Sequence, residues 1–162
     1  HPDVAVSLNN LAMSLNAQGD LRHAEPLLLR GLKIRELALP PDHPRTALIL
    51  TNLANTLMME AGKSGEAEAL LRRAIRIREK ALGANHPQLA SSLRSLADLC
   101  RDQKRYTEAE ALYRRALAIY DAAYPPAHPE RQALLKSYAS LLRVTGRAGQ
   151  AAALGREAGA RT

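Results

Sequence analysis

The chain has 162 residues and a formal net charge of +7, and 46% of its residues are hydrophobic although Phe and Trp are absent. A core of Leu, Ile and Ala suits close packing of helix on helix. The excess of cations favours an acidic partner, and no stretch approaches the ~18 apolar residues of a membrane span, so we expect no membrane partner.

The dipeptide His-Pro divides the chain. It stands at His1, His43, His86 and His128, at intervals of 42, 43 and 42 residues. A fixed period in this range is typical of solenoids, in which each unit buries its apolar face by stacking on the next. We therefore predict one array of four repeats over residues 1–162, with the repeats at 1–42, 43–85, 86–127 and 128–162.

The first repeat contains two helix patterns. Leu8, Leu11, Ala12 and Leu15 have the spacing of one buried helix stripe. Gln18-Gly19-Asp20 predicts a turn with Asp20 as the cap of a second helix. The buried stripe expected for that second helix is Ala24, Leu27, Leu28, Gly31 and Ile34.

The second and third repeats follow the same plan. In the second repeat, the first helix is predicted to bury Leu50, Leu53, Ala54 and Leu57, and the second helix Ala67, Leu70, Leu71, Ala74 and Ile77. In the third repeat, the first helix is predicted to bury Leu93, Leu96, Ala97 and Cys100, and the second helix Ala109, Leu112, Tyr113, Ala116 and Ile119. The extra residue of the 43-residue interval falls in the turn 59–65, where an insertion is tolerated. Thr107 and Glu110 fit a capping box, and Cys100 fits a small buried apolar residue.

The fourth repeat is the weakest of the four. Leu135, Tyr138, Ala139 and Leu142 predict its first helix, and Thr145-Gly146-Arg147 predicts the turn. In the last helix, Gly155 and Gly159 each cost about 1 kcal/mol relative to Ala. We expect the end of this helix to fray.

These stretches together resemble the tetratricopeptide repeat. The resemblance rests on Leu-Ala pairs such as Leu53-Ala54, each followed after a turn by Ala-Glu, as at Ala67-Glu68; the fourth repeat has Ala151-Ala152 instead. The long period and the His-Pro openings resemble the variant found in kinesin light chains. The resemblance implies an all-α, right-handed α-solenoid of helix-turn-helix repeats, whose first helices line a concave groove that binds peptides or partner proteins.

Helix geometry selects candidate groove residues, because side chains beside the buried stripe share one face at about 100° per residue. The N-terminal half offers amides, which both donate to and accept from a peptide backbone, and methionines, which adapt to varied side chains. The C-terminal half offers cations suited to carboxylates. The predicted peptide-binding residues are Asn9, Asn10, Met13, Asn16, Asn52, Asn55, Met58, Arg94, Asp98, Arg101, Lys136 and Arg143.

Each interpretation has an alternative. The asparagines are also explained as solvated helix residues, and Asp98 and Asp102 as neutralising the nearby arginines in surface pairs. The second-helix cations, such as Arg72, Arg73 and Arg76, fit a solvated face, with nucleic-acid binding as an alternative that the scarcity of aromatic side chains disfavours. A structural spacer, or self-association through the terminal repeats, is a further alternative.

The sequence offers no motif for catalysis, so we predict no enzyme, no cofactor and no metal. The four histidines of the His-Pro steps lie in different repeats, on the order of 10 Å apart, and cannot share one ion. A single cysteine predicts a reducing compartment, and hence a cytoplasmic protein. The first residue is His rather than Met, and we expect the chain to be a fragment of a longer protein.

Overall fold

The computed structural model describes residues 1–159, except the side chain of Pro2, and these residues form helices joined by short connections. They divide into two compact units, His1–Gly83 and Ala84–Thr162. Unit 1 contains helices α1 (Pro2–Ala17), α2 (Leu21–Ala38), α3 (Pro44–Met58) and α4 (Ser64–Leu82). Unit 2 contains α5 (Pro87–Asp102), α6 (Tyr106–Ala123), α7 (Pro129–Val144) and α8 (Ala148–Gly159).

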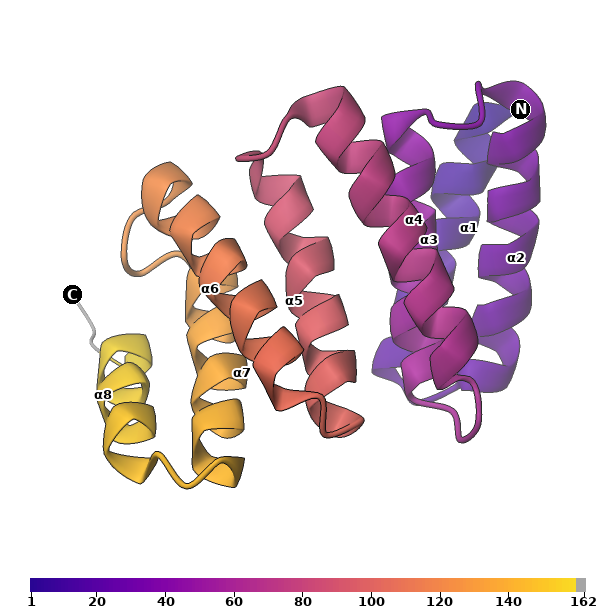
Figure 1. Ribbon diagram of the computed structural model, residues 1–162. Coiled ribbons are helices and arrows are strands. Elements are labelled where there is room, and N and C mark those ends of the chain that lie inside the picture. Colours follow the sequence, from indigo (N-terminus) through magenta and orange to yellow (C-terminus); the bar gives the residue numbers. More distant parts are fainter. Residues whose placement is uncertain (160–162) are drawn as a thin grey trace. The chain divides into compact units, whose positions relative to one another are not determined.

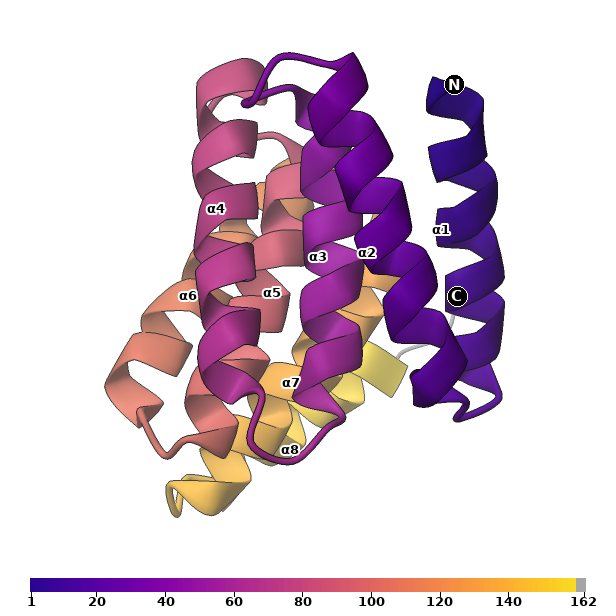
Figure 2. The same ribbon diagram turned by 90° about the vertical axis from the view of Figure 1, so that its right-hand side faces the viewer.

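Each unit consists of two antiparallel helix pairs. In unit 1, α1 packs on α2 and α3 on α4, and the two pairs meet through α2 and α3, with α1 also touching α3 (Figure 2). Unit 2 repeats this plan with α5, α6, α7 and α8 (Figure 1). Every unit therefore brings two first helices side by side, α1 with α3 and α5 with α7.

The His-Pro steps start the first helices. Proline is the first residue of α1, α3, α5 and α7, and the histidine before it is the N-cap. The His Nδ1 accepts the backbone N–H two residues further on, at 3.4, 3.1, 3.2 and 3.3 Å in chain order. Proline holds the preceding residue in an extended conformation and lacks an N–H that would be unsatisfied there. Each histidine thus caps its own helix, as Ser or Asp would elsewhere.

The turns within the pairs confirm the predicted stops. Three residues join α1 to α2, α5 to α6 and α7 to α8, whereas five residues, 59–63, join α3 to α4 and hold the extra residue. Gly19, Gly62 and Gly146 have positive φ in three of these turns, where glycine carries no steric cost. The turn after α5 uses Lys104 instead, with φ of 62°.

The predicted core is confirmed on α3, α5 and α7, where every residue of the expected stripe is buried, Cys100 included. On the second helices the buried face is rotated slightly from the prediction. Leu32 and Arg35 are buried on α2 where Leu27 and Ile34 were expected, and Tyr120 joins the core on α6. Leu70 on α4 and Leu112 on α6, also predicted to be buried, are half-buried. On α8, Ala151 is buried and Leu154 half-buried.

The prediction for α1 is wrong in part. Leu11 is 53% exposed, whereas its equivalents Leu53, Leu96 and Tyr138 are buried. Leu53 lies where α2 packs on α3, and no described helix covers the corresponding side of α1. Leu8 and Leu15, which were also predicted to be buried, are half-buried, and the buried residues of α1 are Ala5, Asn9 and Ala12.

Two predicted caps are also wrong. Thr107 lies inside α6, which begins at Tyr106, and Arg105 is at the N-cap without a side-chain capping bond. Asp20 is at the N-cap of α2, but its carboxylate contacts His23 Nδ1 at 2.8 Å rather than a backbone amide. No side chain therefore caps the backbone at these two helix starts.

Candidate functional site

The candidate amides of unit 1 connect the two first helices. Asn52 Nδ2 donates to Asn9 Oδ1 at 2.8 Å, and Asn16 Nδ2 donates to Thr56 Oγ1 at 2.7 Å. Asn9 is only 7% exposed, so it lies mostly inside. These hydrogen bonds fix α1 against α3, and they use part of the amide capacity that the prediction assigned to a ligand.

The other candidates of unit 1 are more accessible. Asn10 and Met13 are exposed on α1, and Asn55 and Met58 are half-buried on α3. Asn16 Oδ1 is buried and has no hydrogen-bond partner among the described residues. Unit 1 therefore presents a mixed face of amides and methionines without charge.

In unit 2, Arg101 is neutralised within its own helix pair. Its guanidinium lies 3.3 Å from Asp98 Oδ1 and 3.0 Å from Asp102 Oδ1, and it also donates to the Tyr113 hydroxyl at 3.3 Å. The Tyr113 hydroxyl donates to Asp98. Burial first, and then the Asp98 carboxylate, raise the pKa of Tyr113. Asp98 and Arg101 thus form the surface pair that was the alternative to ligand binding.

The remaining candidate cations of unit 2 differ in whether they are paired with an acidic side chain. Arg94 Nη1 lies 3.6 Å from Glu130 Oε2, across from α5 to α7. Lys136 and Arg143 on α7 are exposed and form no hydrogen bond or ion pair with any described residue. They stand seven positions apart, about two helical turns, and therefore share one face.

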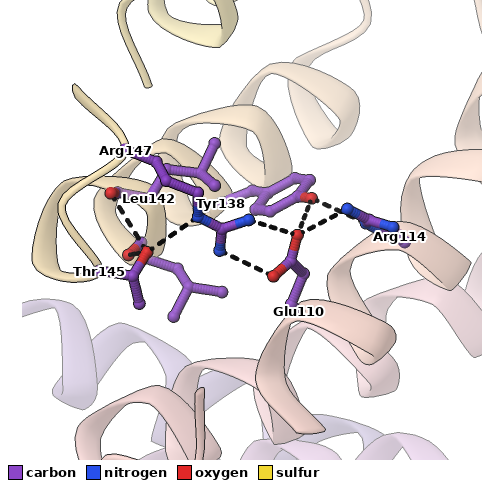
Figure 3. A network of polar contacts seen from close by, with 7 residues as sticks. Glu110, Arg114, Tyr138, Leu142, Thr145 and Arg147 are labelled. Carbon is purple, nitrogen blue, oxygen red and sulfur yellow. Dashed lines mark hydrogen bonds and ion pairs between the residues drawn. The ribbon is translucent and has the colours of Figure 1, made fainter. Parts of the chain in front are cut away.

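A polar cluster ties α6 to the α7–α8 pair, and sequence reasoning missed it (Figure 3). The two oxygens of Glu110 accept two bonds from Arg147, at 2.9 and 2.7 Å. Glu110 Oε1 also accepts from the Tyr138 hydroxyl at 3.0 Å and from Arg114 Nη2 at 2.8 Å, while Arg114 Nε donates to the Tyr138 oxygen at 3.1 Å. The hydrogen bond from Arg147, with that from Tyr138, lowers the pKa of Glu110 to about 2.

A sequence signal for this cluster exists. Glu110 is followed 37 residues later by Arg147, just before the next second helix, and Glu25 is followed 38 residues later by Lys63 at the equivalent place. Lys63 Nζ contacts Glu25 Oε2 at 2.6 Å and Glu60 Oε2 at 2.9 Å. The acid and base are far apart in sequence but recur at one repeat position, which marks an inter-repeat ion pair.

The second-helix cations are largely paired with acids. Arg72 contacts Glu68 at 2.7 Å, Arg73 contacts Glu36 at 2.6 Å, and Lys80 contacts Asp42 at 3.2 Å. A cavity of about 320 Å³ lies between them, lined by Asp42, Arg73, Arg76, Ile77 and Lys80. This pairing agrees with a solvated, ion-paired face. Among the described residues, no group of His, Cys, Asp and Glu side chains is arranged to hold a metal.

Stacked pairs of antiparallel helices with a regular period define an α-helical repeat protein. A family model described as tetratricopeptide repeat matches residues 3–80 and 45–122. The chain belongs to the tetratricopeptide repeat family. No curated protein matches the sequence.

Solved structures give the same result. The chain is similar to a Podosopora anserina protein described as a kinesin light chain with nearly identical TPR-like repeats, at 26% identity and a TM-score of 0.83, over 98% of this chain and 74% of that one. It is also similar in fold to BtubC (BKLC) from P. vanneervenii, at 21% identity and a TM-score of 0.83, over 98% and 63%. MamA matches at 16% identity with a TM-score of 0.61, over 97% and 77%.

The family sets the broad function. Tetratricopeptide repeats generally mediate protein–protein interactions, and scaffold families of this kind are typically non-catalytic. No described helix combines the length and apolar character needed to cross a bilayer.

Proposed function

We propose that this chain binds an acidic peptide segment of a partner protein along its first helices, with its four helix pairs acting as one array. The observation that carries the proposal is the pair Lys136 and Arg143. They are exposed on one face of α7 and have no counter-ion among the described residues. Carboxylates on an extended segment would supply the missing partners.

The neighbouring side chains support this assignment. Ser140 lies between the two cations on α7 and is half-buried, so it offers a hydroxyl to a backbone. Arg94 on α5 contacts Glu130 at 3.6 Å, a long and partly exposed ion pair that a ligand carboxylate would displace at small cost. Arg101 is held by two aspartates, and we assign it to positioning Asp98 and Tyr113 rather than to the ligand.

The candidate residues on the first helices of unit 1 are amides and methionines rather than cations. Asn10 and Met13 are accessible on α1, with Asn55 and Met58 on α3. Asn9, Asn16 and Asn52 already bridge the helices, so they would position the face and contribute at most their remaining donors and acceptors.

Binding of a fluorescently labelled, Glu/Asp-rich dodecapeptide tests the proposal. Lys136→Glu/Arg143→Glu should weaken binding by tenfold or more, about 1.4 kcal/mol, because two attractions become repulsions. Arg22→Glu/Arg30→Glu changes the net charge equally, but on the exposed surface of α2, and should leave affinity within about twofold by the same scale.

Three outcomes would contradict the proposal. Equal losses in both double variants would mean that only net charge matters. Tighter binding to an oligonucleotide than to the peptide, falling steeply with salt, would favour nucleic acid. Absence of binding by a chain that remains helical would leave a spacer or self-associating scaffold, which a concentration-dependent mass would identify.

A further inference from the structure

An apolar cavity of about 340 Å³ opens in unit 1 between α2, α3 and α4. Five leucines and an alanine form most of its wall, and two carboxylates stand at its edge; the lining residues are Glu25, Leu29, Leu32, Leu53, Leu57, Glu66, Ala69 and Leu70. Leu53 and Leu57 are buried at its floor, and Leu29 is 49% exposed at its mouth. None of its lining residues belongs to the proposed acidic-peptide site.

In unit 2, side chains of the chain itself occupy the space that is equivalent to this cavity. The ion pair Glu25–Lys63 of unit 1 recurs as Glu110–Arg147 in unit 2, at 2.6 and 2.7 Å respectively. Relative to these pairs, Leu53 is replaced by Tyr138 and Leu29 by Arg114, each 85 positions further along. The two places are therefore equivalent in packing and differ in what occupies them.

The occupants in unit 2 are a phenol and a guanidinium. The ring of Tyr138 stacks on Tyr113 with centroids 5.5 Å apart. Its hydroxyl donates to Glu110 at 3.0 Å (Figure 3). Arg114 contacts both the Tyr138 oxygen and Glu110. In unit 1, leucines stand at both positions, so the apolar wall and the carboxylate remain while the ring and the cation are missing.

The two carboxylates at the edge of the cavity also favour a ligand with a phenol and a cation. Glu25 is engaged by Lys63, as Glu110 is by Arg147, and Glu110 nevertheless accepts a phenol hydroxyl. Glu66 at the other edge is exposed and has no partner among the described residues, and its equivalent in unit 2 is the neutral Gln150. A cation beside an inserted ring would neutralise Glu66.

We infer that the cavity of unit 1 receives a tyrosine side chain of a partner protein, flanked by an arginine. The ring would fill the leucine-lined space, its hydroxyl would donate to Glu25, and the guanidinium would lie against Glu66. The chemistry of this site is opposite to that of α7, where acidic groups are expected, so one partner segment could use both sites only by carrying both kinds of residue.

The test is a methyl NMR titration of the leucines with three blocked tetrapeptides, Gly-Arg-Tyr-Gly and its Phe and Ala counterparts. The Tyr peptide should shift the methyl signals of Leu29, Leu53, Leu57 and Leu70 in a saturable way. The Phe peptide should bind about 3- to 10-fold more weakly, because it lacks one hydrogen bond to a charged acceptor. The Ala peptide should leave these signals unchanged.

Two variants close the cavity by copying unit 2. Leu53→Tyr supplies the ring and should abolish the shifts. Leu29→Arg supplies the cation at an exposed position and should weaken binding of the Tyr peptide by tenfold or more. This variant tests the inference if Leu53→Tyr fails to fold. Tyr138→Leu/Arg114→Leu should open a second ring site in unit 2, with Gln150 in place of the carboxylate of Glu66, and shift the methyl signals of Leu142 and Leu154.

Equal shifts with the Tyr and Ala peptides, or undiminished binding by both cavity-closing variants, would overturn the inference. Lys136→Glu/Arg143→Glu serves as the matched control and should leave Tyr-peptide binding unchanged. The acidic-peptide proposal and this one therefore fail separately.

Discussion

The two units solve the same packing problem with different side chains. In unit 1, Leu29 and Leu53 line a cavity and Lys63 pairs with Glu25. In unit 2 the equivalent residues are Arg114, Tyr138 and Arg147, and Arg147 donates two hydrogen bonds to Glu110. In unit 2 the Glu110 carboxylate accepts four hydrogen bonds, from Arg114 on its own helix, from Tyr138 on α7 and from Arg147 in the α7–α8 turn. The same arrangement of helices therefore leaves a cavity in unit 1, whereas in unit 2 the side chains of Tyr138 and Arg114 fill the equivalent space.

The largest expected difference concerns the two glutamates. Glu110→Ala should destabilise unit 2 by about 2–3 kcal/mol, since it leaves Arg147 and the buried Tyr138 hydroxyl without their acceptor. Glu25→Ala should cost about 1 kcal/mol or less, because Lys63 keeps Glu60. Hydrogen exchange of amides in α6–α8 and in α2–α4 measures the two effects unit by unit. A larger loss in unit 1 would contradict the comparison.

The next largest expected difference is the effect of acid on the stability of unit 2. The folded-state pKa of Glu110 is lowered to about 2, so the unfolded chain binds a proton here at higher pH than the folded chain does. The stabilisation is complete above about pH 4.5 and is lost as the pH falls through about 2. Hydrogen exchange of α6–α8 over this range should show the loss, and Glu110→Gln should flatten it. An unchanged profile in the variant would assign acid sensitivity to other carboxylates.

Arg35 in unit 1 and Tyr120 in unit 2 form a second contrast. Arg35 is only 5% exposed, and its Nε and Nη1 have no partner among the described residues. Burial, and then the nearby Arg45, lower its pKa. Tyr120 instead places a phenol 3.5 Å from Glu130. Arg35→Met should stabilise unit 1 by about 1–2 kcal/mol, because an unpaired buried cation is removed and its volume is kept. Denaturant unfolding measures this, and a loss of stability would reveal a partner for Arg35.

The smallest contrast concerns the capping histidines. His128 caps α7 and also stacks on Tyr124, with centroids 3.6 Å apart and planes at 7°, while His43 caps α3 without a ring contact among the described residues. His43→Ala should cost about 0.5–1 kcal/mol, and His128→Ala about 0.5–1 kcal/mol more. Denaturant midpoints of the two single variants provide the measurement. Equal costs would mean that the stacked rings contribute nothing.

The sequence predicts the helices and turns well because these depend on local pattern. The stripes of α3, α5 and α7, the insertion at 59–63 and the burial of Cys100 all follow from periodicity within one repeat. Leu11 shows the limit, since a stripe does not tell whether a neighbouring helix covers it.

The site depends on contacts between repeats, which a helical projection of one repeat omits. Projection places Asn9 beside Asn10 on an open face, although its bond to Asn52 draws it inside. It likewise assigns Glu110 to a local cap with Thr107, because the competing partners Arg147 and Tyr138 lie 37 and 28 residues away. The exposure of Lys136 and Arg143 was predictable only because no such partner intervenes among the described residues.

The His-Pro step also bears on how such a chain could evolve. Each histidine caps the helix that follows it, so the helix start is completed by its own repeat and takes no side-chain cap from the repeat before. A duplication or recombination event with its boundary ahead of His43, His86 or His128 therefore transfers a helix pair together with its start signal. The inherited pair can then diverge at positions such as Leu53 and Tyr138 without losing the backbone plan, and the number of repeats can change by whole pairs.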